Sequence, residues 1–267
     1  MSVKGKKVVR FDMHCHVKEG SPDSKVAIAD AVRILHEKGF SGMLVTDHDS
    51  YKGYRAWREE HKDECPEDFV VLRGIEYDTI DAGHFIVIMP SNVKLKILEL
   101  RGLPVYILMD IVHKHGGILG PAHPFGERYL SIFRTGIYKY HKHITREFDF
   151  VECFNACIDE TANEEAVAVA KEYGNAMFGG SDFHKEDCIG MGYTEFPANI
   201  SIKTEDDLIK YIKCGGETVC GGERYTKTTK DKIGKFNHVL IQGFWVYNKG
   251  LGAARRRKRV KELKHMD

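Results

Sequence analysis

Short apolar runs alternate along the chain with longer segments in which apolar residues recur every three or four positions. The short runs predict strands at residues 8–13, 42–46, 69–72, 84–89, 118–120, 148–153 and 176–180. The longer segments predict helices at residues 24–38, 105–115, 161–173 and 204–215. Strands that alternate with helices of about 10–15 residues are typical of βα units with a parallel sheet.

Helix ends carry their own signals. Thr161 with Glu164, and Thr204 with Asp207, have the spacing of a capping box, in which two side chains satisfy the first backbone N–H groups of a helix. Gly39 follows the first predicted helix at the position where a left-handed residue commonly ends a helix.

Side chains of the kind that bind metals follow many of the predicted strands. The stretches are His14-Cys15-His16, Thr46-Asp47-His48-Asp49, Gly74-Ile75-Glu76, Ala122-His123-Pro124 and Ser181-Asp182-Phe183-His184. The strand pattern alone allows an open doubly wound sheet or a closed barrel. Residues that follow many different strands converge on one point when the strands form a ring, so the ligand placement favours an α/β barrel.

The spacing within these stretches fits metal binding. His14 and His16 lie two apart, so in an extended strand both imidazoles point to the same face, and Asp182 and His184 repeat this spacing. Glu76 has two carboxylate oxygens that could bridge two cations. Mixed histidine and carboxylate ligands suit Zn²⁺, Mn²⁺ or Fe better than Mg²⁺.

Composition and charge narrow the class of protein. The 267 residues are 42% hydrophobic and 30% charged, as in an ordinary soluble enzyme, and no apolar run is long enough to span a membrane. The N-terminus lacks the apolar stretch of a signal peptide, so we expect a cytoplasmic protein. Residues 255–267 contain seven Lys/Arg against two Asp/Glu, although the whole chain has a net charge of only +1. This basic tail is a candidate for weak contact with nucleic acid or anionic lipid, and a solvated terminal helix is the alternative.

The seven cysteines are odd in number and irregularly spaced, which predicts free thiols in a reducing compartment. Cys153 and Cys157 form a C-x-x-x-C pair, but no second Cys/His pair completes a tetrahedral zinc site.

Taken in order, the motifs D-M-H-C-H, V-T-D-H-D, G-I-E, A-H-P and G-S-D-F-H resemble those of the polymerase-and-histidinol-phosphatase (PHP) family of metal-dependent phosphoesterases. The resemblance spans about residues 8–222. It implies a distorted TIM-like barrel of the (β/α)7 type, with two or three divalent ions (Zn, Mn or Fe) at the C-terminal ends of the strands. We therefore expect a barrel domain at 1–222 and, at 223–267, an extension in which residues 236–250 pack on the barrel.

Carried over residue by residue, the resemblance implies three ion sites. The first has the ligands His14, His16, Glu76 and Asp182, the second has Glu76, His84 and His123, and the third has His48 and His184. Many members also have a Ser-Asp-Gly whose aspartate supports the third site. This chain lacks it, so either Glu19 or Asp23 substitutes or the third site is weak. Only 38 residues separate His84 from His123, so no large insertion precedes A-H-P and we expect an open pocket.

The chemistry expected of such a centre is phosphoester hydrolysis, in which a hydroxide bridging two cations attacks phosphorus. The expected substrate is a small phosphomonoester or a short nucleotide. Glu76, Asp182 and His184 are the catalytic candidates, and Asn155, Lys185 and Arg128 are the substrate-binding candidates, with Lys18 and Arg134 as further cations. Tyr51, Tyr54 and Trp57 could stack on a substrate ring, although core packing is the more common role. The alternatives are an amidohydrolase-type C–N hydrolase and a metal-stabilised nucleic-acid-binding protein.

Overall fold

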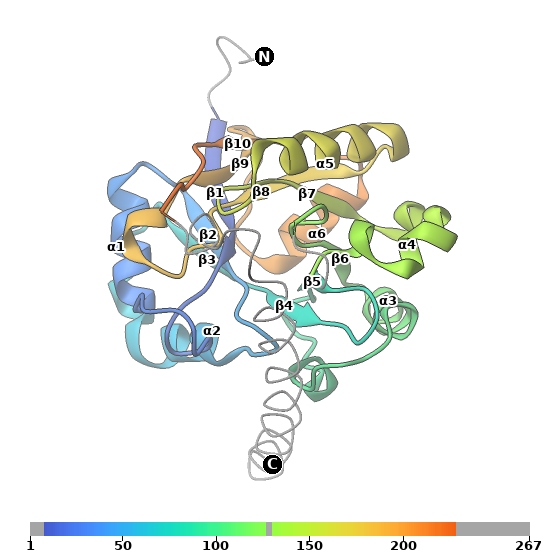
Figure 1. Cartoon of the computed structure of the whole chain (residues 1–267). Helices are drawn as coiled ribbons and strands as arrows, with labels where there is room; N and C mark the ends of the chain where they lie inside the picture. The colour runs from blue at the N-terminus through green and yellow to red at the C-terminus, as the bar shows by residue number, and fades with distance from the viewer. Residues whose placement is uncertain (1–7, 127–129, 228–267) are drawn as a thin grey trace.

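Ten strands in three small sheets form the centre of the computed structural model, which describes residues 8–126 and 130–227 (Figure 1). The first sheet has the order β10 (Val219–Gly222), β9 (Gly192–Pro197), β1 (Val8–Cys15), β2 (Gly42–Val45) and β3 (Val70–Arg73). The second has the order β4 (Ile75–Asp78), β5 (His84–Ile88) and β6 (Ile118–Pro121). The third pairs β7 (Phe150–Asn155) with β8 (Ala176–Gly180).

Six α-helices are found in the described residues, and Figure 1 shows them around the outside of the strands. They are α1 (Ile28–Glu37), α2 (Lys52–Ala56), α3 (Val105–Lys114), α4 (Gly136–Tyr140), α5 (Glu160–Tyr173) and α6 (Glu205–Lys213). A π-helical turn covers Trp57–His61, and short 3₁₀ turns cover Lys62–Glu64, Lys96–Glu99, Ile132–Arg134, Lys142–Glu147 and Glu186–Cys188.

The expected closed barrel is not formed by the described strands, although the sheet edges meet. Backbone N–H groups donate across these edges from Asp49 to Glu76 at 2.9 Å and from Glu76 to Thr46 at 3.2 Å. Asp149 likewise donates to Leu119 at 3.0 Å, and Asp182 to His14 at 2.8 Å. The hydrogen-bonded ladder stops between β3 and β4, between β6 and β7, and between β8 and β1, where the first half of β1 pairs with the antiparallel strand β9. Strands β4, β5 and β6 form a continuous antiparallel ladder of their own. The observed fold is therefore mixed α/β with three sheets.

The strands nevertheless share one apolar centre. Side chains from many strands pack in a single buried cluster that includes Phe11, Leu44, Leu72, Ile86, Ile118, Phe150, Phe178 and Phe196. The rings of Phe150 and Phe178 stack with their centroids 4.1 Å apart. Burying these large side chains contributes most of the favourable free energy of folding in this region.

Several predicted element boundaries are wrong. Helix α1 begins at Ile28 rather than at residue 24, and its N-terminal backbone N–H bonds to the carboxylate of Glu19. Helix α5 is capped by Asp159, which accepts from the backbone N–H of Ala162, so the expected Thr161 box is not formed. The capping box of Thr204 and Asp207 is confirmed.

Strands β4, β9 and β10 were not predicted: β4 follows β3 after the single residue Gly74, and β10 ends in two glycines that weaken its strand pattern. None of the described helices has the length and apolar character needed to cross a membrane. The division of the chain at residue 222 stays a prediction, because the segment 236–250 and the tail 255–267 lie outside the described residues.

Candidate metal centre

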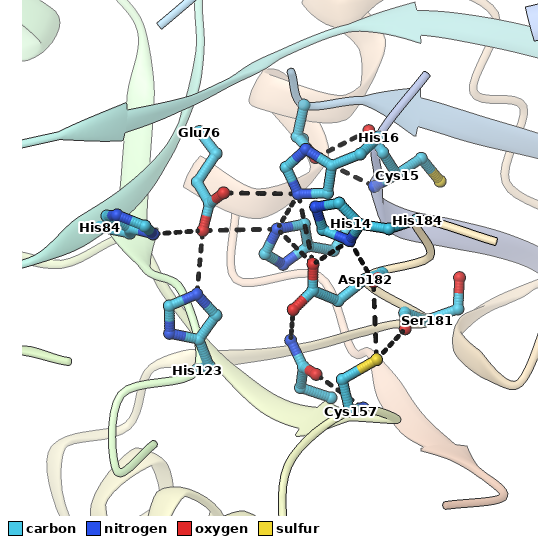
Figure 2. Close-up of polar contacts among 12 residues, drawn as sticks. His14, Cys15, His16, Glu76, His84, His123, Cys157, Ser181, Asp182 and His184 are labelled. Atoms are coloured by element: carbon cyan, nitrogen blue, oxygen red, sulfur yellow. Dashed lines mark hydrogen bonds and ion pairs between the residues drawn. The ribbon is translucent and has the colours of Figure 1, made fainter. Parts of the chain in front are cut away.

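Ligand-type side chains from several strands meet at one edge of the sheets (Figure 2). His14 and His16 end β1, and Glu76 lies in β4. His84 opens β5, and the antiparallel pairing of Asp78 with His84 brings that end of β5 to the same edge. His48, His123, Asp182 and His184 follow β2, β6 and β8.

Three residues at this edge have positive backbone φ although none is glycine. They are Asp49 (46°), His123 (30°) and Asp182 (50°), and the described residues contain no other such non-glycine position. Asp49 and Asp182 are held by the inter-sheet hydrogen bonds given above, and the N–H of His123 donates to Glu152. Strained backbone persists where its surroundings fix it, and it is concentrated at functional sites.

Glu76 lies at the middle of the cluster, with 1% of its side chain exposed. One carboxylate oxygen lies 2.9 Å from Nδ1 of His84 and 2.9 Å from Nε2 of His123. The other lies 2.8 Å from Nδ1 of His48 and 3.3 Å from Nε2 of His16. Burial alone would raise the pKa of Glu76, but the surrounding histidines hold it well below its ordinary value, so the carboxylate is charged.

His14 and His16 point their Nε2 atoms at one another, 3.0 Å apart. Oδ1 of Asp182 lies 3.6 Å from Nε2 of His14 and 3.2 Å from Nε2 of His16. Nδ1 of His14 lies 2.8 Å from the carboxylate of Glu152, so this nitrogen donates. Burial disfavours the charged imidazole, yet Glu152, Asp182 and Glu76 raise the pKa of His14 well above its ordinary value.

His48 and His184 lie on the more open side of the cluster, with 27% and 29% of their side chains exposed. Their Nε2 atoms lie 3.4 and 3.6 Å from the same oxygen of Asp23. The rings of both stack on His16, at centroid distances of 4.4 and 4.3 Å. Of the two acidic residues considered for this position, Asp23 therefore faces the cluster, whereas Glu19 caps α1.

The donor set fits divalent cations. Donor atoms lie within 4.8 Å of one another in three groups: His14, His16 and Asp182; His48, Glu76 and His84; and His16, His48 and His184. The buried carboxylates are stable only when positive charge lies beside them. Protonated His14, whose pKa is raised, provides such a charge, and a metal ion bound among the same side chains would provide it instead. Imidazole and carboxylate donors together suit Zn²⁺, Mn²⁺ or Fe.

The substrate-binding candidates have different surroundings. Asn155 is buried, and its side-chain amide donates to Asp182 at 3.2 Å and to Glu152. Lys185 is exposed directly after His184, and Lys18 is also exposed. Arg134 is directed away, because it pairs with Glu165 and lies over the ring of Phe125. Arg128 lies outside the described residues.

The aromatic and sulfur candidates are part of the packing. Tyr51 and Trp57 are buried in two apolar clusters, and Tyr54 packs against the cluster that contains Trp57. These three side chains therefore pack in the core. All seven cysteines are free, and none of the three donor groups contains a cysteine. Cys157 instead lies beside Cys188, with 3.7 Å between the sulfurs.

Two buried acids near the ligands were not predicted. Glu152 holds His14, and Asp12 accepts from the N–H and the hydroxyl of Ser181 beneath the cluster. Burial raises the pKa of Asp12 to about 6. Asp12 and Glu152 each lie within a strand of buried apolar residues. A charged residue in such a strand is unusual, and this feature of the sequence could have identified both acids.

Comparison with known proteins supports this picture of the fold. A family model described as PHP-associated matches residues 160–216. PsfC from Pseudomonas syringae PB-5123 is similar in structure at 17% identity (TM-score 0.61), with 92% of this chain and 99% of that chain covered.

Two further solved structures are similar at low identity. A two-domain protein from Bacteroides vulgatus, which contains a predicted PHP-like metal-dependent phosphoesterase, shares 18% identity (TM-score 0.56) over 82% of this chain and 66% of its own. Endonuclease Q, solved with a duplex containing an abasic lesion, shares 17% (TM-score 0.54) over 79% of this chain and 58% of its own. No curated protein sequence matches the chain.

The fold and the ligand cluster thus define a mixed α/β chain of PHP-like architecture. The resemblance to the PHP family, first seen in the motifs, is confirmed by the family model and the structural neighbours.

Proposed function

We propose that this protein is a metal-dependent phosphoesterase that hydrolyses a small phosphomonoester or a short nucleotide. The observation that carries the proposal is Glu76, a buried charged carboxylate with imidazole nitrogens of His16, His48, His84 and His123 within 3.3 Å. The PHP-like fold and the name of the Bacteroides vulgatus neighbour support the phosphoester class.

We infer three cation positions from the resemblance to the PHP family, supported by the contacts within the cluster. His14, His16, Glu76 and Asp182 would hold the first, Glu76 with His84 and His123 the second, and His48, His184 and Asp23 the third. Cations bound there would neutralise phosphoryl oxygens and lower the pKa of a water for attack on phosphorus.

The chain's own residues supply orientation and proton handling. Glu152 keeps the proton of His14 on Nδ1, and Asn155 holds the second oxygen of Asp182, so both ligands face the cluster. If the third position holds no cation, His184 is the proton carrier proposed for the leaving oxygen, because it is partly exposed and its Nε2 lies 3.6 Å from Asp23. Lys185 beside it is the proposed phosphate contact.

A nucleic-acid substrate is the second candidate. Endonuclease Q was solved with a duplex substrate that has an abasic lesion at the active site, and this chain is similar to it in fold at 17% identity. The exposed lysines at positions 18 and 185 are consistent with a polyanionic substrate.

The deciding experiment measures phosphate release from a panel of phosphomonoesters and nucleotides, and strand cleavage of abasic-site DNA, each with added Mn²⁺ or Zn²⁺. His14→Ala removes a ligand, and His113→Ala is the matched control, because His113 pairs with Asp149 outside the cluster. Turnover that is lost in the first variant and kept in the second supports the proposal. Hydrolysis of amides but of no phosphoester would contradict the proposal and support the alternative of a C–N hydrolase.

A further inference from the structure

Ser21 connects a ligand histidine to an acid that the proposed mechanism does not use. Its Oγ lies 3.1 Å from Nδ1 of His16 and 2.9 Å from Oδ1 of Asp47. All three side chains are buried, with no measurable exposure of His16, Ser21 or Asp47. The backbone N–H of His48 also donates to this hydroxyl, at 3.2 Å.

The direction of these hydrogen bonds follows from the groups involved. Oδ1 of Asp47 already accepts from the N–H of Val17 at 2.9 Å, so it is an acceptor for Ser21 as well. The serine therefore donates its hydrogen to Asp47, and its oxygen accepts from Nδ1–H of His16. The lone pair of His16 is then on Nε2, which faces Glu76 and Asp182.

The carboxylate of Asp47 packs directly against the backbone of two glycines, Gly20 and Gly53. A Cβ added at Gly20 or at Gly53 would overlap the carboxylate of Asp47. Burial raises the pKa of Asp47 to about 7, but a proton would go to Oδ2, because Oδ1 accepts two hydrogen bonds. The hydrogen bonds from His16 through Ser21 to Asp47 therefore persist in either state of the acid, and the ionised carboxylate makes them stronger.

We propose that Ser21 and Asp47 are positioning residues that fix His16 as its Nδ1–H tautomer and thereby set the affinity of the cluster for divalent cations. Glu152 does the same for His14 by direct contact, so two ligands of one cation are oriented from opposite sides. The inference rests on the cation sites of the proposed function and is independent of the substrate.

A spectroscopic readout tests the tautomer directly. In full-length protein with ¹⁵N-labelled histidine and saturating Zn²⁺, we expect His16 to show a protonated Nδ1 and a ligated Nε2. Ser21→Ala removes the acceptor, so the Nδ1–H signal of the zinc-loaded protein should shift and broaden through exchange with water. In metal-free protein, where Nε2 is not ligated, the same variant should carry part of the His16 proton on Nε2. A His16 spectrum identical to that of the unmodified protein would overturn the proposal.

Zinc affinity, measured by competition with a chelating dye, gives a second readout that needs no enzymatic activity. Ser21→Ala should weaken binding about 10–100-fold, the usual effect of losing a partner behind a metal ligand. Ser24→Ala is the matched control, because Ser24 is buried in the same loop and donates to the backbone carbonyl of His16 at 2.8 Å, not to its ring. Equal losses in the two variants would reduce Ser21 to a loop-stabilising residue and overturn the inference.

Asp47→Asn keeps the shape of the acid and removes its charge, so it serves if Ser21→Ala does not fold. The Nδ1–H signal of His16 should move to lower chemical shift and zinc affinity should fall, whereas unchanged values would contradict the role of Asp47. These results remain distinct from the substrate question. Weaker zinc binding in a protein that hydrolyses no phosphoester would uphold the positioning role and reject the proposed reaction.

Discussion

Glu76 shows at the scale of one residue how the candidate centre depends on buried charge. Glu76→Gln keeps the size of the side chain and removes the charge that faces His14, His16, His48, His84 and His123. We expect metal affinity and hydrolysis to fall by more than about 100-fold, because even partners outside the ligand shell contribute about 10–100-fold. Metal content by elemental analysis and phosphate release measure the two losses.

The same variant predicts a shift in titration. Glu76 and Asp23 raise the pKa of His48 well above its ordinary value despite burial, so losing the charge of Glu76 should lower that pKa in metal-free protein. An NMR titration of His48 checks the direction. Glu165→Gln is the control, because Glu165 pairs with Arg134 on the surface, and a fall of the His48 pKa in both variants would refute the assignment.

The histidines and acids that meet in the cluster could be predicted from the sequence, whereas the residues that support them could not. His14 and His16 share a face because they lie two apart in a strand, which is local geometry. The partner of His14 is Glu152, which is 138 residues away. No periodicity encodes which of many acids meets which histidine across that distance, so only the folded arrangement of β1 and β7 identifies the pair.

At the scale of the elements, a close approach of strands fixes the loop that carries Asp182. A Cβ at Gly192 in β9 would overlap the backbone of Gly180 and Ser181 at the end of β8. We expect Gly192→Ala to lower the free energy of unfolding by about 1–3 kcal/mol, the usual cost of overpacking, and to weaken metal binding as well. Urea unfolding and zinc titration measure both effects.

Gly136→Ala provides the comparison, because nothing lies within 4 Å of a Cβ built at that position. This variant should be as stable as the unmodified protein, or slightly more stable, since alanine favours helix. Equal stability of both alanine variants would show that the approach of β8 and β9 is looser than described.

Helix α6 gives a prediction with a defined pH dependence. Thr204→Ala removes the capping box and should cost about 1 kcal/mol of stability. Although burial opposes it, hydrogen bonds from Lys203 and Thr204 lower the pKa of Asp207 below its ordinary 3.8. A lowered pKa in the folded state means that the stabilisation by Asp207 is present above about pH 4 and is lost as the pH falls further.

Urea unfolding of Thr204→Ala and of the unmodified protein at pH 7 and near pH 3 tests this behaviour. The stability difference between the two proteins should shrink at the lower pH. A difference that stays constant would mean that the carboxylate of Asp207 does not take part in the cap. The sequence predicted this box correctly because its partners are three residues apart, and it failed at α5 because Asp159 competed with Thr161 for the same role.

At the scale of the whole molecule, the predicted ring of strands correctly brought the candidate ligands together, but the described strands do not close into a barrel. The ligands meet at one edge, and the strands share one apolar cluster. The hydrogen-bonded ladder is broken between β3 and β4, between β6 and β7, and between β8 and β1, where β9 pairs with β1 instead. Alternating strands and helices indicate how many βα units exist, but the edge pairing depends on contacts between distant segments.

Metal removal tests how far the cluster stabilises this open arrangement. The ligands come from residues 14 to 184, so they come together only in the folded chain, and a cation that binds the folded state alone stabilises it. At a free concentration 100 times its dissociation constant, that stabilisation is about 2.7 kcal/mol, which corresponds to a rise in melting temperature of about 5–10 °C for a domain of this size. Calorimetry of chelator-treated protein, with and without restored Zn²⁺ or Mn²⁺, measures the rise, and Glu76→Gln should show almost none of it. If the unmodified protein binds the restored cation but melts at the same temperature as the chelator-treated sample, the cation is bound outside the cluster that joins the three sheets.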